Sequence, residues 1–140
     1  MITREQLQTL ARVKLQEAEA LFAAGFYDGC AYLCGYVVEF ALKAKICAAL
    51  NVNEYPEKGT RLREAFRTHN FDDLVLLAGM GRDFTTEHPE RLTHWAIASQ
   101  WAPDWRYNPQ GSYDRMAAER MLDAVRSVPN GVLACISSHW

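Results

Sequence analysis

The stretch GCAYLCGYVVEFALKAKICAAL, residues 29–50, decides the fold class of this chain. Its residues are apolar almost all the way round a helix, and it contains no proline. A helix on the surface of a protein has one apolar stripe, whereas a helix that is apolar on every side is buried. The stretch therefore predicts a long helix in the centre of a helical domain.

The residues before this stretch predict a helix that packs against it. Thr3 and Gln6 form a capping-box pattern, and apolar residues then recur at helical spacing until Gly25. Only a few residues separate this first helix from the central one. Such a short connection favours an antiparallel hairpin.

The residues after the central stretch predict shorter helices. A short helix is expected over residues 61–67, and Asn70 can cap the next one. Pro89 occupies a first-turn position of a helix that runs to about residue 101. Ser112 can cap a further long helix, and the apolar piece at residues 132–136 returns to the core. We therefore expect one all-α domain over residues 1–140, with five or six helices and no strand.

Composition narrows the cellular setting but names no partner. The 15 basic and 17 acidic residues leave a net charge of -2, which gives no overall attraction to nucleic acid. The polar start and the lack of an apolar run of roughly 18 residues predict a soluble, cytoplasmic protein without a membrane contact. The four cysteines lack paired spacing and the four histidines fit no metal motif, so we expect no disulfide, metal or cofactor. His69, which stands before a helix, is expected to cap or to pack.

Glu39 is the one acidic residue in the apolar central stretch, and a buried carboxylate needs a partner. Lys43 follows at i+4, in the favourable order for an ion pair within one helix. The alternative is that Glu39 accepts hydrogen bonds from a cation elsewhere in the bundle, for which Arg106 is the best candidate.

Arg106 lies between Trp105 and Tyr107, with Pro103 and Pro109 on either side. The prolines restrain the backbone, and the aromatic rings offer faces on which a guanidinium can stack. Two interpretations follow. Arg106 is either a structural clamp that ties a loop to a helix, or part of a functional site.

Four stretches together resemble the HEPN family of small helical domains, and they span nearly the whole chain in the order expected for that family. They are ALFAAGFYDGCAYLCGYVVEFALKAKI (20–46), HNFDDLVLLAG (69–79), WAPDWRYNP (101–109) and AAERMLDAVRSV (117–128). The resemblance implies an up-and-down helical bundle that forms a homodimer. It also implies a link to RNA or nucleotides, often in toxin–antitoxin systems beside a minimal nucleotidyltransferase.

Catalytic members of this family carry an arginine followed after four to six residues by a histidine. Arg106 matches the arginine, but the histidine window holds Gly111, Ser112 and Tyr113, which gives Arg-x6-Tyr. An unperturbed tyrosine, with a pKa near 10, is a poor general base at neutral pH.

The resemblance assigns site roles to several residues. Arg106 and Tyr113 would be the catalytic candidates, and the supporting or ligand-binding candidates would be Glu39, Lys43, Tyr107 and Ser112. In the family, an acidic residue of the second helix often supports the motif arginine, which favours a pair between Glu39 and Arg106. Tyr107 or Tyr113 could also be a target for modification by a nucleotidyltransferase. Gly35, one turn before Glu39, would allow a close approach by another backbone or helix.

Three functions follow from this pattern. The leading hypothesis is a module that binds nucleic acid or nucleotides and lacks the standard RNase histidine. The alternatives are a metal-independent RNA endonuclease with a noncanonical motif, and a structural or partner-binding subunit of a nucleotidyltransferase complex.

Overall fold

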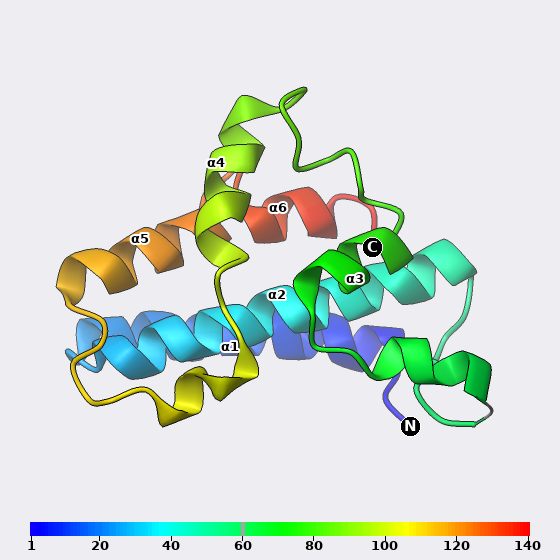
Figure 1. Cartoon of the computed structure of the whole chain (residues 1–140), viewed down its shortest axis with the longest axis horizontal. Helices are drawn as coiled ribbons and strands as arrows, with labels where there is room; N and C mark the ends of the chain where they lie inside the picture. Colours follow the sequence, from blue (N-terminus) through cyan, green and yellow to red (C-terminus); the bar gives the residue numbers. More distant parts are fainter. Residues whose placement is uncertain (60) are drawn as a thin grey trace.

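A computed structural model describes residues 1–59 and 61–140 of the chain (Figure 1). Over these residues the fold is all-α, with six α-helices, two short 3-10 helices and no strand. This confirms the fold class expected from the sequence. The elements are α1 (Arg4–Ala23), α2 (Tyr27–Leu50), η1 (Arg61–Arg67), α3 (Phe71–Leu77), α4 (Pro89–Ala98), η2 (Pro103–Tyr107), α5 (Arg115–Arg126) and α6 (Val132–Ser137).

Helices α1 and α2 form the expected antiparallel hairpin and lie side by side in Figure 1. The predicted capping box is present, because the Thr3 hydroxyl accepts the Gln6 amide at 3.1 Å and the Gln6 side chain accepts the Thr3 amide at 2.9 Å. Gly25 follows the helix with a φ of 84°, a conformation that glycine adopts without strain. The hairpin thus begins and turns where the sequence predicts.

Helix α2 is the centre of the fold. It contacts α1, α3, α4, α5, α6 and η2. Leu42 and Ala44, two positions apart and so on nearly opposite sides of the helix, are both fully buried. In Figure 1, α5 and α6 run along one side of the hairpin, while α4 is steeply inclined to them and lies over the place where they meet. Within the described residues, none of the helices combines the length and apolar content needed to cross a membrane.

Two predicted boundaries are wrong. The α4 helix ends at Ala98, short of residue 101, and the α5 helix is capped by Asp114 and not by Ser112. The Asp114 carboxylate accepts the Ala117 amide at 2.8 Å, whereas the Ser112 hydroxyl donates to the Pro109 carbonyl. Serine and aspartate are both good N-cap residues, but Asp114 is the one that directly precedes the first helical residue.

Candidate functional site

Residues 101–113 cross the outside of α2 and carry Arg106. The first end of this segment is fixed by Trp101, whose side chain is 4% exposed. Its ring lies directly over Gly35, where an added Cβ would come within 2.0 Å of the indole atoms. The indole N–H donates to the Tyr32 carbonyl at 3.0 Å, and the ring stacks on Phe71 with centroids 5.4 Å apart. Gly35 therefore allows a close approach, but by the Trp101 side chain and not by the backbone or helix that was expected.

The second end of the segment is fixed by Asp28, in the first turn of α2. One carboxylate oxygen accepts the Gly111 amide at 2.7 Å, and the other accepts the Tyr113 amide at 2.8 Å. Charge-assisted bonds of this kind are stronger than neutral ones. The sequence analysis missed this role, because an aspartate at a helix start is already explained by the helix dipole.

Between these two anchors, η2 holds Arg106 on the surface. The guanidinium donates one hydrogen bond, from Nη1 to the Pro103 carbonyl at 3.3 Å, and its carbon lies 4.7 Å from the centroid of the Tyr107 ring. Beside it is a pocket of about 220 Å³, lined by Arg106, Asp28, Tyr32 and Tyr113 among others, which we call the Arg106 pocket. Most of the guanidinium donors thus remain open to a ligand.

Two tyrosines in or beside the Arg106 pocket have a raised pKa: Tyr113, which lines the pocket, and Tyr36, which is hydrogen-bonded to the lining residue Tyr32. Tyr113 packs against Trp105, with centroids 5.0 Å apart, and its burial, helped by the Asp28 carboxylate, raises its pKa to about 12. The Tyr32 and Tyr36 hydroxyls lie 3.0 Å apart, and this hydrogen bond together with burial raises the pKa of Tyr36 to about 12. Neither hydroxyl can serve as a general base near neutral pH.

Glu39 lies deep in the bundle, with 2% of the residue exposed. One of its oxygens accepts from the Lys43 ammonium at 2.9 Å and from Nδ1 of His69 at 2.8 Å. The other oxygen has no hydrogen-bond partner among the described residues. The i to i+4 pair with Lys43 is therefore confirmed.

The expected pair between Glu39 and Arg106 is wrong. The Arg106 guanidinium bonds to the loop backbone, and His69 occupies the place at the carboxylate. His69 was expected to cap or to pack, but Asn70 caps α3 by accepting the Asp73 amide at 3.1 Å. The contact joins residues 30 positions apart, and no local pattern indicates it.

The imidazole of His69 is itself accessible, with 55% of its side chain exposed. It lines a pocket of about 260 Å³ together with Asp72, Ser99, Pro103 and others, which we call the His69 pocket. Sequence reasoning found no role for this surface. The only signal was an acidic residue in an apolar helix that required a partner.

The remaining predicted site residues fall into two groups: Tyr107 and Ser112 belong to the loop that carries Arg106, and Lys43 lies in the interior. Tyr107 is 75% exposed and supports the guanidinium, and Ser112 stabilises the turn before α5. Lys43 lies over the Tyr55 ring at 5.1 Å in the interior. The structure therefore brings together Arg106, Tyr107 and Tyr113, and places Glu39 and Lys43 in a separate buried network.

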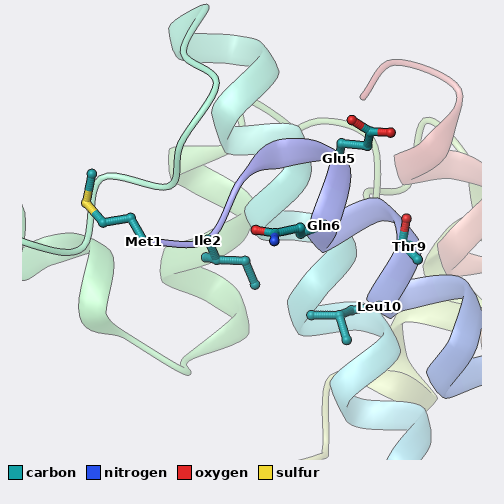
Figure 2. A pocket seen from close by; sticks show the side chains of 6 residues that line it. All are labelled: Met1, Ile2, Glu5, Gln6, Thr9 and Leu10. Carbon is teal, nitrogen blue, oxygen red and sulfur yellow. The ribbon is translucent and has the colours of Figure 1, made fainter.

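A larger groove of about 500 Å³ lies along the start of α1 (Figure 2). Its lining residues are Met1, Ile2, Glu5, Gln6, Thr9 and Leu10. Their side chains supply one carboxylate and no basic group, so no lining side chain can neutralise a phosphate. Among the described residues there is also no group of three or more side chains placed to hold a metal ion.

The fold and the site define a class: a small all-helical domain that presents an arginine on a loop anchored across its buried central helix. The model of the HEPN domain matches residues 5–133, and the chain belongs to this family. HEPN domains in general are linked to nucleotide- and RNA-related functions and often form dimers. Neither a comparison with curated proteins nor one with solved structures gave a match.

Proposed function

We propose that this chain binds the phosphate of a nucleotide or of RNA through Arg106 and does not cleave RNA. The observation that carries the proposal is the state of the guanidinium. It is exposed at the mouth of a pocket, and among the described residues its one hydrogen bond goes to the Pro103 carbonyl. The Tyr107 ring supports its face, and the nearby Tyr107 and Tyr32 hydroxyls raise the pKa of the guanidinium. Arginine in such a position binds phosphate oxygens with a planar pair of donors.

The groups around Arg106 support binding over cleavage. Cleavage at the ribose 2'-hydroxyl needs a group that accepts a proton near neutral pH. The histidine window holds Tyr113, whose raised pKa keeps its hydroxyl protonated, and the neighbouring carboxylate of Asp28 is engaged by two backbone amides. The pocket can therefore hold an anion but has poor means to move a proton.

The proposal includes a homodimer in the cytoplasm, as the family resemblance implies. Large apolar side chains are exposed at the same end of the bundle as η2, at the starts of α2 and α5: Phe26 and Met116. A second copy would cover apolar surface of this kind and bring another Arg106 near the first. A nucleotidyltransferase partner in a toxin–antitoxin setting remains a prediction of the family resemblance alone.

The test is binding and cleavage of a labelled single-stranded RNA at low salt, with Arg106→Ala and Arg106→Lys beside the natural sequence. We expect salt-sensitive binding that Arg106→Ala weakens about tenfold or more, partial retention in Arg106→Lys, and intact RNA throughout. Arg82→Ala, at another exposed arginine, is the matched control and should bind normally. Equal binding by Arg106→Ala would overturn the proposal, and cleavage that depends on Arg106 would replace it with the nuclease function.

A further inference from the structure

The Arg106 and His69 pockets lie next to each other along the segment that crosses α2. Pro103, the first residue of η2, lines the His69 pocket, and its carbonyl accepts the hydrogen bond from Arg106. Pro103 therefore connects the guanidinium to the His69 pocket. A ligand whose phosphate contacts Arg106 can extend its other end over Pro103 into the His69 pocket.

The His69 pocket is rich in hydrogen-bond acceptors. The Glu39 carboxylate can only accept, so the proton of the neutral imidazole is on Nδ1, and Nε2 is left as an acceptor on the exposed ring. The Asp72 carboxylate, on the same pocket wall, also accepts only. The buried network fixes this arrangement, because Lys43 and His69 share one Glu39 oxygen.

The size of the His69 pocket sets the kind of group that fits. At about 260 Å³ it is smaller than the roughly 300–1,000 Å³ of pockets that enclose a whole drug-sized ligand. It suits one planar ring system with the rest of the molecule outside. Trp101 and Phe71 both line the pocket, and their rings stack on each other, which makes this part of the wall rigid.

We infer that the His69 pocket recognises a nucleobase that carries an exocyclic amino group, while Arg106 holds the phosphate of the same nucleotide. The amino groups of adenine and cytosine are donors that match the acceptors of His69 and Asp72, whereas hypoxanthine and uracil present a carbonyl oxygen at that position. An acceptor facing an acceptor leaves both groups without a partner. This inference rests on the proposed function and adds base selectivity to it.

The experiment is calorimetric titration of the full chain with AMP, IMP, CMP and UMP, in low salt at about pH 8. We expect AMP to bind about tenfold more tightly than IMP, and CMP about tenfold more tightly than UMP. His69→Phe keeps a ring but removes one of the two acceptors, and should lower both ratios. The matched control is His139→Phe, at an exposed histidine, and it should keep both ratios.

The possible outcomes distinguish base recognition by the His69 pocket from phosphate binding by Arg106. If AMP and IMP bind equally and both lose affinity in Arg106→Ala, phosphate binding holds and base recognition is overturned. If no mononucleotide binds while RNA binding still depends on Arg106, base recognition is overturned and phosphate binding holds; if neither nucleotides nor RNA bind, both are overturned. A readout on the natural sequence guards against a variant that fails to fold: the NMR signals of the His69 ring should shift with AMP and stay in place with ribose 5-phosphate. Equal shifts with both ligands would contradict base recognition.

Discussion

Replacing Gly35 by alanine should release the segment that carries Arg106. The added Cβ would lie 2.0 Å from two atoms of the Trp101 ring and 2.2 Å from its nitrogen, far inside ordinary contact distances. The ring cannot shift and still keep its hydrogen bond to the Tyr32 carbonyl and its stack on Phe71. We therefore expect the indole to leave its site.

The size of the effect follows from two opposing contributions. Loss of a buried tryptophan from a core costs about 3–5 kcal/mol, while alanine in place of a helical glycine returns about 1 kcal/mol. The net loss in the free energy of unfolding should be about 2–4 kcal/mol. Urea unfolding measures it, and tryptophan fluorescence in the folded state should report a more exposed indole.

Gly29→Ala is the matched control for this experiment, because Gly29 lies in the same helix. Its added Cβ would meet only the end of the Leu21 side chain, at 3.2 Å, and that side chain can turn away. We expect little loss of stability, or a small gain from helix propensity. If Gly35→Ala is as stable as the natural sequence, or if both variants lose the same amount, the close packing of Trp101 on α2 does not anchor the segment.

Three further predictions concern the network around the site. Asp28→Asn should weaken the hydrogen bonds to the Gly111 and Tyr113 amides by about 1–3 kcal/mol and speed the hydrogen exchange of these two amides. Unchanged exchange would show that Asp28 does not fix the second end of the segment. Glu39→Gln leaves the buried Lys43 ammonium without its counter-ion, so it should lower the free energy of unfolding, measured in urea, by roughly 3–5 kcal/mol. A loss below about 1 kcal/mol would contradict the burial of this ion pair. The pKa of Tyr113 is raised in the folded protein to about 12, so the protonated hydroxyl contributes its full stability below pH 10, and this contribution is lost as the pH rises from about 10 to 12. In urea unfolding, the Tyr113→Phe variant should therefore lose less stability than the natural sequence over this range. Equal losses would count against the burial of the hydroxyl.

The sequence predicts the helices because their signals are local. The apolar stretch around Val38, the Thr3 cap and the Gly25 turn each depend on residues within one or two turns of each other. The pair of Glu39 with Lys43 is predicted for the same reason, since one helix carries both residues. Boundaries such as the start of α5 fail where two good caps stand close together.

The site is less visible in the sequence because tertiary contacts build it. Asp28 reaches residues 83 and 85 positions away, and His69 takes the place at Glu39 that was assigned to Arg106. Each of these side chains is polar and has several possible partners, so the sequence alone does not choose among them. Arg106 was identified because its aromatic and proline neighbours form an unusual local pattern, and its role in binding stays a prediction.

The most direct test of the account is the difference in affinity between AMP and adenosine, which differ by the phosphate alone, measured with the natural sequence and with Arg106→Ala. If Arg106 binds the phosphate, the natural sequence prefers AMP about tenfold or more, and Arg106→Ala binds the two compounds equally. A preference for AMP that survives in Arg106→Ala would place the phosphate elsewhere and contradict the central claim.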